Sequence, residues 1–277
     1  MDSLKKKELM KKAADVRIGI IEGVHAAKSG HPGGSLSIAD ILTYLYFDYL
    51  NIDPEDPKNE NRDRFVLSKG HAAPALYSVL ANRGYFDVSE LKTLRHIGSF
   101  LQGHPDMKHI PGVDMSSGSL GQGISAACGM ALSAKHFKND FKVFTVLGDG
   151  ELEEGQVWEA AMFAGNKGLD NLTAFIDLNN LQIDGTIDEV NSAKPVDKKF
   201  EAFNWHTITI DGHDFVQIEA ALKEAETVNK PVAIIANTVK GKGVSFMENQ
   251  VSWHGSAPND EQYEIAMNEL KAYKAAL

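Results

Sequence analysis

The chain has 277 residues, of which 43% are apolar and 24% charged, the composition of an ordinary soluble globular protein with ample material for a hydrophobic core. Its formal net charge of −10 argues against a nucleic-acid-binding protein, which would normally carry a basic stripe. No apolar run approaches the roughly 18 residues of a membrane span, the first residues lack the apolar region of a signal peptide, and Cys128 has no second cysteine to pair with, so we expect a cytoplasmic protein without nucleic-acid or membrane partners.

Apolar residues at helical spacing and short apolar runs alternate through the first half of the chain. They predict a strand over residues 64–68 and helices over residues 9–28, 35–50, 72–83 and 120–137. The second of these helices is expected to start at Ser35 or Ser37. A group of lysines near the N-terminus is interpreted as the solvated face of the first helix rather than a phosphate-binding arm. Residues 98–119 are rich in Gly, Pro, His and Ser, and we expect a functional loop there, because structureless runs of that length are otherwise uncommon.

The second half continues the alternation. Strands are predicted over residues 143–147, 172–176, 207–210 and 232–236, and helices over residues 151–164, 215–228 and 260–275. Residues 180–204 are expected to be irregular and the last helix peripheral. The pattern predicts an α/β fold: one doubly wound domain over residues 1–277, with a mostly parallel sheet flanked by helices.

Two of the predicted strands end in turns that carry an oxygen ligand. The strand over residues 143–147 stops at a Gly-Asp-Gly corner around Asp149, and the strand over residues 172–176 is soon followed by an Asn-Asn pair at Asn179. Parallel strands bring their carboxyl ends to one edge of the sheet, where ligands bind in open α/β folds. Mg²⁺ prefers hard oxygen ligands, usually one or two carboxylates with phosphate oxygens. We therefore predict a diphosphate-bound Mg²⁺ with Asp149, Asn179 and the carbonyl of Leu181 as ligands.

The Gly-Asp-Gly corner also suits a phosphate. Gly148 and Gly150 let the backbone come close to it, and the N-terminal N–H groups of the following helix face the same anion. Glu151, Glu153 and Glu154 are expected in the first turn of that helix, where the helix dipole favours carboxylates. An ordinary turn would explain the Gly-Asp-Gly motif or the Asn-Asn motif on its own. Two ordinary turns are a poor explanation for both motifs at the ends of successive strands.

A competing motif lies at Gly121-Gln122-Gly123, which with the following residues fits the G-x-G-x-x-G/A dinucleotide fingerprint. That fingerprint requires a strand immediately before it. Residues 110–117 contain a proline, a glycine and an aspartate where the strand should be. We therefore disfavour nicotinamide binding.

Four histidines stand beside glycine in loop-like contexts: His31, His71, His104 and His254. A loop or cap role would explain any one of them. Together they indicate a polar site with close backbone approach, because histidine can donate, accept or transfer protons near neutral pH. No function is predicted for the remaining histidines, His25, His96, His109, His136, His206 and His213.

The corner motifs resemble the thiamine-diphosphate and Mg²⁺ motif of thiamine-dependent enzymes, and the surrounding phrases resemble the transketolase family. Those phrases are Ser29-Gly30-His31-Pro32-Gly33, Ser68-Lys69-Gly70-His71-Ala72-Ala73, Gly103-His104-Pro105-Asp106, Gly118-Ser119-Leu120-Gly121-Gln122-Gly123 and Trp253-His254-Gly255. They arrive in the family's order, from about residue 9 to the C-terminus. The resemblance covers the diphosphate-binding half of a full-length transketolase, and the chain ends where the pyrimidine-binding half would begin.

The resemblance implies a thiamine-diphosphate-binding fold, with thiamine diphosphate and Mg²⁺ as cofactors and Ca²⁺ or Mn²⁺ as substitutes for the metal. It implies that His31, His71, His104 and His254 are catalytic. The cofactor-binding residues that it implies are His71, Gly118, Ser119, Leu120, Asp149, Gly150, Glu154, Asn179, Lys240 and His254. A surface turn is the plain alternative for Lys240, and a helix-surface charge for Glu154.

The implied reaction transfers a two-carbon ketol unit from a ketose phosphate to an aldose phosphate. The glutamate that contacts the aminopyrimidine, and most arginines for the sugar phosphate, belong to the other half in this family. The expected partner is therefore a separately encoded C-terminal transketolase subunit. We expect the two to form an α2β2 assembly, and the isolated chain to be without activity.

Alternative functions are the α subunit of a 2-oxo-acid dehydrogenase, a non-catalytic cofactor-binding subunit, and an α/β domain without cofactor. 1-Deoxyxylulose-phosphate synthase is disfavoured because both of its cofactor halves lie in one longer chain. Two positions depart from the family pattern. Gly33-Gly34 stands where some members have a serine that contacts the diphosphate, and Ser256 stands where related sequences often have a lysine. The sugar donor is therefore left open.

Overall fold

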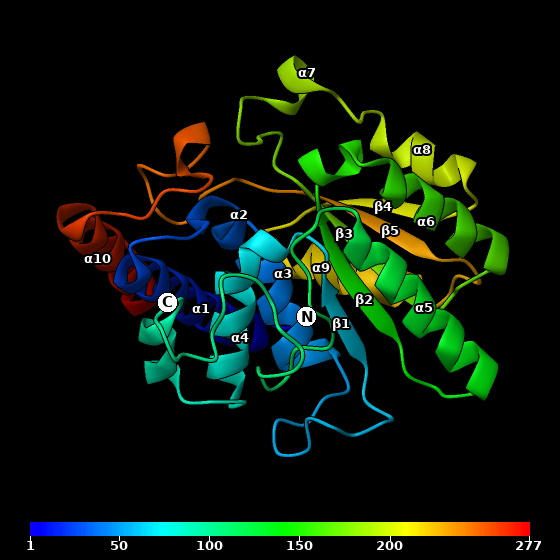
Figure 1. Ribbon diagram of the computed structural model, residues 1–277, viewed down its shortest axis with the longest axis horizontal. Coiled ribbons are helices and arrows are strands. Elements are labelled where there is room, and N and C mark those ends of the chain that lie inside the picture. Colours follow the sequence, from blue (N-terminus) through cyan, green and yellow to red (C-terminus); the bar gives the residue numbers. More distant parts are fainter.

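A parallel five-stranded sheet forms the centre of the molecule in the computed structural model, which describes residues 1–277 (Figure 1). Its strands are β1 (Arg64–Leu67), β2 (Val143–Gly148), β3 (Leu172–Leu178), β4 (His206–Asp211) and β5 (Val232–Asn237). They lie in the order β1-β2-β3-β5-β4, and every neighbouring pair is parallel. The predicted doubly wound α/β fold is confirmed.

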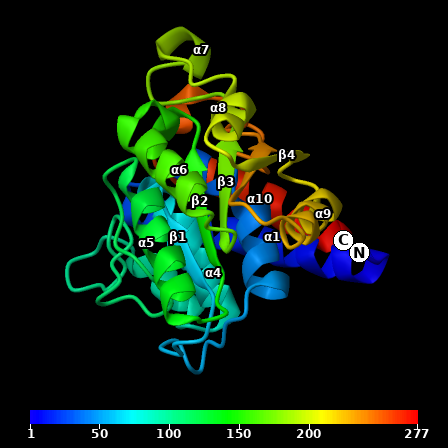
Figure 2. The ribbon, with the colours of Figure 1, turned by 90° about the vertical axis from the view of Figure 1, so that its right-hand side faces the viewer.

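Helices cover both faces of this sheet. The helices of the chain are α1 (Ser3–Ala27), α2 (Pro32–Leu36), α3 (Ala39–Tyr44), α4 (Ala73–Arg83), α5 (Gln122–Phe137), α6 (Gly155–Lys167), α7 (Ile187–Val190), α8 (Val196–Ala202), α9 (Phe215–Ala225) and α10 (Asp260–Ala276), not all of which contact the sheet. Helices α5, α6 and α8 lie on one side of the strands, and α1, α3 and α4 on the other (Figures 1 and 2).

Alternation along each strand explains this double covering. In β1, Phe65 and Leu67 join a cluster of 46 buried apolar residues that includes α1, α3, α4, α9 and α10. Val66 points the other way, into a cluster of 24 that includes α5, α6 and α8. Because successive side chains leave a strand on opposite faces, an almost continuously apolar strand needs helices on both sides.

Several element boundaries differ from the sequence prediction. The first helix begins at Ser3 instead of residue 9, because the side chain of Asp2 caps it by accepting from the Lys5 N–H; the early turns are polar and give no apolar period. The single helix predicted over residues 35–50 is wrong: α2 and α3 form there, followed by a π-helical turn over Leu45–Tyr49.

The segments around the predicted corners also differ. A 3₁₀ turn over Gly150–Glu153 precedes α6, so the acidic residues after Asp149 do not occupy the first turn of the α-helix. The segment 180–204 contains α7 and α8, which are too short to show a helical period. The last helix, α10, is not merely peripheral, since it buries Ala266, Met267 and Leu270 and packs against α1.

The loop predicted over residues 98–119 contains neither helix nor strand, as expected. It runs from the turns after α4 to the N-terminus of α5. The carboxyl ends of β1, β2, β3 and β5 lie at one edge of the sheet, and this loop meets them there. None of the helices combines the length and apolar character that a membrane crossing requires.

Candidate functional site

A cavity of about 250 Å³ lies at the carboxyl ends of the central strands. The predicted site residues among its lining are His31, His71, Gly118, Leu120, Asp149, Gly150, Asn179, Leu181, Lys240 and His254. Three predicted residues do not line it: His104, Ser119 and Glu154 are exposed, although the ring of His104 lies 6.5 Å from that of His31, which does line the cavity. The sheet edge thus brings together most residues that the motifs nominated, from segments more than 200 positions apart.

The first corner presents a buried carboxylate to the cavity. Asp149 follows β2 directly and is 3% exposed. One of its oxygens accepts the Gly150 N–H at 2.9 Å, and the other accepts the N–H of Asn180, from the corner after β3. These bonds fix the two turns to each other, which the sequence spacing alone could only suggest.

The second corner adds two neutral oxygens. Asn179 donates its amide N–H to Asp177 at 3.0 Å, which points the amide oxygen toward the Leu181 N–H at 3.1 Å. The Leu181 carbonyl accepts the ammonium of Lys240 at 2.9 Å. A positive group therefore already lies on one of the three predicted metal ligands.

The charge balance of this corner fits a bound cation. Burial, and then the negative charge of Asp177, raise the pKa of Asp149 to about 6. A divalent ion beside Asp149 would favour the ionised form again. No group of three His, Cys, Asp or Glu side chains is arranged as a metal site. A metal here must use amide, carbonyl and phosphate oxygens beside one carboxylate, and Mg²⁺ accepts that set.

Lys240 lies inside the site and is not the surface turn that the sequence allowed. It is 2% exposed, and its ammonium contacts the Leu181 carbonyl and, at 3.0 Å, Nδ1 of His254. Burial, and then the charge of Lys69, lower its pKa to about 8. A desolvated ammonium at the floor of a cavity is suited to a diphosphate, because its charge is weakly screened there.

The four predicted histidines form one cluster. The ring centroid of His31 lies 5.3 Å from that of His71, 5.5 Å from that of His254 and 6.5 Å from that of His104. The rings of His71 and His254 stack at 5.2 Å. Burial lowers all four pKa values, to about 4 for His31 and about 3 for His254. The rings are neutral near pH 7 and can both donate and accept.

One atom of this cluster has no partner within the protein. Nδ1 of His31 is buried without a hydrogen bond, although buried polar atoms are nearly always paired. His254, in contrast, accepts the Lys240 ammonium through Nδ1, so its proton lies on Nε2. Within the cluster, the contact with Lys240 therefore fixes His254 as a donor through Nε2, and Nδ1 of His31 lacks a protein partner.

A buried ion pair beneath the cavity was missed by the sequence analysis. Lys69 Nζ lies 2.5 Å from Asp177 Oδ2, and both side chains are almost fully buried. Asp177 also accepts the hydroxyls of Ser37, at 2.7 Å, and Thr238. Burial would raise the pKa of Asp177, but the charge of Lys69 and these donors lower it below the ordinary value. The pair joins β1 to β3 across 108 positions, a separation that leaves no local sequence signal.

Glu151 was also misassigned. It is 2% exposed and accepts the hydroxyl of Ser68 and the backbone N–H groups of Gly121 and Gly148, at 2.9 and 3.0 Å. It fixes the ends of β1 and β2 to the entrance of α5. Gly123 packs at the same point, since a Cβ there would lie 2.5 Å from the Ser68 Cα. The glycines of the apparent dinucleotide fingerprint thus serve close packing, and no strand precedes them.

Comparisons with known proteins agree with this geometry. Residues 9–273 match the family described as transketolase, thiamine diphosphate binding domain. The chain is 46% identical over 267 residues to the 6-deoxy-6-sulfo-D-fructose transketolase subunit of a Clostridium species, covering 95% of this chain and 96% of that protein. It is 43% identical over 252 residues to an apulose-4-phosphate transketolase subunit of Phocaeicola vulgatus, covering 91% and 89%.

The fold is also similar to that of a solved structure. The transketolase of Campylobacter jejuni superimposes with a TM-score of 0.90 at 34% identity, covering all of this chain and 46% of that one. The chain therefore belongs to the transketolase family, as its thiamine-diphosphate-binding N-terminal domain.

Proposed function

We propose that this chain is the cofactor-diphosphate-binding subunit of a split transketolase, which transfers a two-carbon ketol unit from a ketose phosphate to an aldose phosphate. The observation that carries the proposal is a difference in coverage. The chain accounts for 96% and 89% of two relatives that are named transketolase subunits, but for only 46% of the solved transketolase chain. A separate pyrimidine-binding chain would then complete the site in an α2β2 assembly.

In this proposal, Asp149, Asn179 and the Leu181 carbonyl bind Mg²⁺, and Lys240 moves from Leu181 to the diphosphate. The support is that all three residues and Lys240 line one cavity and that the ammonium already contacts the Leu181 carbonyl. The backbone N–H groups of the corner at Gly150 add donors beside the phosphates.

Three further backbone positions are proposed to contact the organic part of the cofactor: Gly118, Ser119 and Leu120. Gly118 has φ of +155°, and the Cβ of another residue there would lie 3.2 Å from the ring of His104. Glycine at this position therefore leaves the space between the Gly118 backbone and the His104 ring free for the cofactor. Glu154 is proposed to act near the subunit interface, in agreement with its exposure.

Thiamine diphosphate, when bound, supplies the nucleophilic carbon and the electron sink that ketol transfer requires. The chain's own contribution is proton transfer and orientation. His31, His71, His104 and His254 are neutral at pH 7 by their lowered pKa values, so each can bind a sugar hydroxyl or carbonyl oxygen. His254 presents an Nε2–H donor, because the Lys240 ammonium occupies its Nδ1.

The proposal specifies the sugar only as a class. The two relatives named as subunits carry the names of different sugars, 6-deoxy-6-sulfo-D-fructose and apulose 4-phosphate. A cytoplasmic location belongs to the proposal as well and agrees with the lone buried thiol of Cys128.

The test is turnover with and without a second chain. The purified protein, the co-purified complex and the complex with Asp149→Ala are each given thiamine diphosphate, Mg²⁺, a panel of ketose phosphates and an aldose phosphate. Two-carbon transfer by the complex alone is expected. Pyruvate without an aldehyde acceptor is the control substrate, and its decarboxylation with no sugar turnover would replace this proposal with a 2-oxo-acid dehydrogenase.

A further inference from the structure

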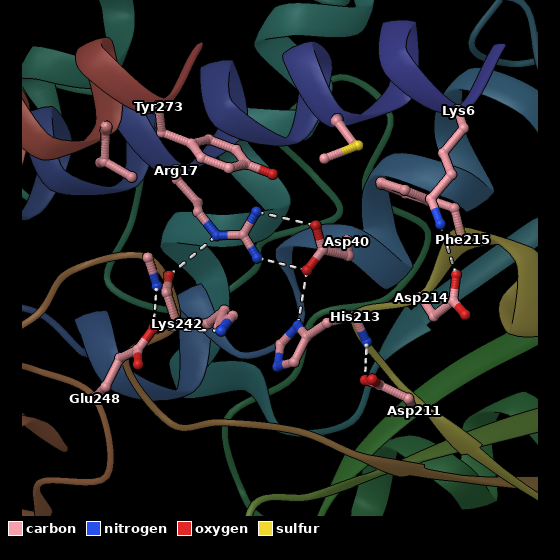
Figure 3. A pocket seen from close by; sticks show the side chains of 13 residues that line it. Lys6, Arg17, Asp40, Asp211, His213, Asp214, Phe215, Lys242, Glu248 and Tyr273 are labelled. Atoms are coloured by element: carbon pink, nitrogen blue, oxygen red, sulfur yellow. Dashed lines mark hydrogen bonds and ion pairs between the residues drawn. The ribbon is translucent and has the colours of Figure 1, made fainter. Parts of the chain in front are cut away.

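A second cavity, of about 520 Å³, lies on the other side of the segment that carries Lys240. It opens between α1, α9, α10 and the chain from Lys242 to Glu248 (Figure 3). Three connected side chains form one of its walls: Arg17 of α1, Asp40 of α3 and His213, which stands two residues beyond β4. We call these three the Arg17–Asp40–His213 network. Neither the motifs nor the proposed chemistry uses them.

Arg17 and Asp40 form the buried centre of the network. The two terminal nitrogens of Arg17 donate to the two oxygens of Asp40 at 3.0 and 2.5 Å (Figure 3). The third donor, Nε, reaches the backbone carbonyl of Lys242 at 3.0 Å. The side chains are 6% and 8% exposed. Burial would raise the pKa of Asp40, but the charge of Arg17 and the bond from His213 hold it at about 2. The pair is a permanent ionic hydrogen-bond unit at neutral pH.

His213 extends the network to the backbone before Lys240. Its Nδ1 lies 2.7 Å from the same Asp40 carboxylate, and its Nε2 accepts the Val239 N–H at 2.9 Å. An N–H group can only donate, so Nε2 carries no proton and the proton of the neutral ring lies on Nδ1. The Asp211 side chain accepts the backbone N–H of His213 at 2.8 Å and thereby fixes the turn (Figure 3).

The two backbone contacts flank Lys240 on both sides. Val239 precedes it and Lys242 follows by two residues, while the Lys240 side chain enters the cofactor cavity. Gly241 and Gly243 in this segment adopt φ of +79° and +94°, which glycine tolerates best, and glycine also loses more conformational freedom than other residues when a segment becomes ordered. Hydrogen bonds from Gly241 to Gly33 and from Asn249 to Lys240 hold it in part. Ordering such a segment only on binding would reduce affinity for the ligand.

We propose that the Arg17–Asp40–His213 network positions Lys240. Arg17 contacts the backbone after the lysine, and His213 contacts the backbone before it. The network orders the backbone on both sides of the lysine before the cofactor arrives. The inference rests on the proposed function in one respect, that Lys240 contacts the cofactor diphosphate. The ordering of the segment itself does not depend on that assignment.

The test separates the two ring nitrogens of His213. In His213→Asn the side-chain amide can still donate to Asp40 from near the Nδ1 position, but the bond to Val239 is lost. In His213→Gln the longer side chain places an acceptor near the Nε2 position. Loss of one such bond raises a dissociation constant by about tenfold. We expect that rise for thiamine diphosphate in the Asn variant of the complex, a clearly smaller one in the Gln variant, and little change in kcat at saturating cofactor.

The matched control is His206→Gln at the opposite end of β4, where the histidine pairs with Glu224 at 2.7 Å on the surface. Hydrogen exchange of residues 238–243 gives a readout without cofactor: faster exchange is expected in His213→Asn than in the wild type or in the control. Unchanged affinity and unchanged exchange in the Asn variant would overturn the inference. Faster exchange in a complex whose wild type binds no thiamine diphosphate would support the positioning network and overturn the proposed function instead.

Discussion

The ammonium of Lys240 lies 2.9 Å from the carbonyl oxygen of Leu181, the oxygen predicted as the third metal ligand. The lysine therefore occupies part of the position assigned to Mg²⁺. Asp149 and Asn179 line the same cavity. The relationship implies an exchange: with Mg²⁺ on the Leu181 carbonyl, the Lys240 ammonium would need another partner, and a diphosphate oxygen would provide it.

This exchange predicts opposite effects of Lys240→Met on two ligands. Removing the ammonium relieves repulsion, so Mg²⁺ alone should bind more tightly. Thiamine diphosphate in the presence of Mg²⁺ should bind about tenfold or more weakly, because a desolvated ion pair is lost. Calorimetric titration of the complex measures both. Lys242→Met is the control, since that ammonium is paired with Glu248 on the surface at 3.5 Å. Equal changes for both ligands would contradict the exchange.

Asp149→Asn should change the pH dependence of stability in the cofactor-free chain. The pKa of Asp149 is raised from 3.8 to about 6, so the folded state retains a proton that the unfolded state releases. The contribution of protonated Asp149 to the free energy of unfolding is therefore full below about pH 4 and is lost as the pH rises through 6. In the variant this pH-dependent change, on the order of 2 kcal/mol between pH 4 and 7, should be absent, because the asparagine amide does not titrate.

The measurement is denaturant unfolding of both proteins between pH 4 and 8, compared as a difference. The Asn and Ala variants should also lose Mg²⁺-dependent cofactor binding in the complex while the fold is retained. A free-energy difference that does not vary with pH, or cofactor affinity that is unchanged by calorimetry, would defeat the assignment of Asp149.

The histidine cluster predicts a pH–rate profile without an acid limb near pH 6.5. Burial lowers the pKa of His31 to about 4 and that of His254 to about 3, so both rings remain neutral at pH 5. In the complex, His31→Gln should lower kcat and leave the acid side of the kcat/KM profile in place. An inflection near pH 6.5 that disappears in this variant would mean that His31 is protonated in the functional range.

Substitution of two glycines of α5, Gly123 and Gly129, tests whether the segment that resembles the dinucleotide fingerprint serves close packing. Gly123→Ala would place a Cβ 2.5 Å from the Ser68 backbone, and should lower the free energy of unfolding by about 1–3 kcal/mol. Gly129→Ala, with no atom within 4 Å of the added Cβ, should be neutral or stabilising by up to about 1 kcal/mol. Thermal and denaturant unfolding decide. Equal effects would show that the contact with β1 does not constrain Gly123.

The sequence predicted the parts of the site that follow from local pattern. Asp149 and Asn179 lie at the carboxyl edge of the sheet, where they were expected, because each follows a strongly apolar strand and parallel strands end at one edge; their role as metal ligands stays a prediction. His31, His71 and His254 followed from their glycine-flanked contexts. The helices inside residues 180–204 were missed because one or two helical turns are too short to show a hydrophobic period. The single helix predicted over residues 35–50 was wrong because nearly every residue of the short α and π segments there is buried, so the hydrophobic pattern does not mark where one segment ends and the next begins.

The supporting polar network could not be predicted in the same way. Lys69 pairs with Asp177 across 108 positions, and Asp40 with His213 across 173. Neither partner lies in a pattern that distinguishes it from an ordinary surface charge. Such pairs become visible only when the fold has buried them, because it is burial that requires a charged group to have a partner.

The central claim is that the corners after β2 and β3 bind a metal diphosphate, and anomalous diffraction from crystals of the complex with Mn²⁺ and thiamine diphosphate tests it most directly. We expect one strong manganese peak about 2 Å from the Asp149 carboxylate, the Asn179 amide oxygen and the Leu181 carbonyl, with Lys240 moved from Leu181 onto a phosphate oxygen. A manganese peak away from both corners, or a diphosphate bound without metal while Lys240 remains on Leu181, would contradict it.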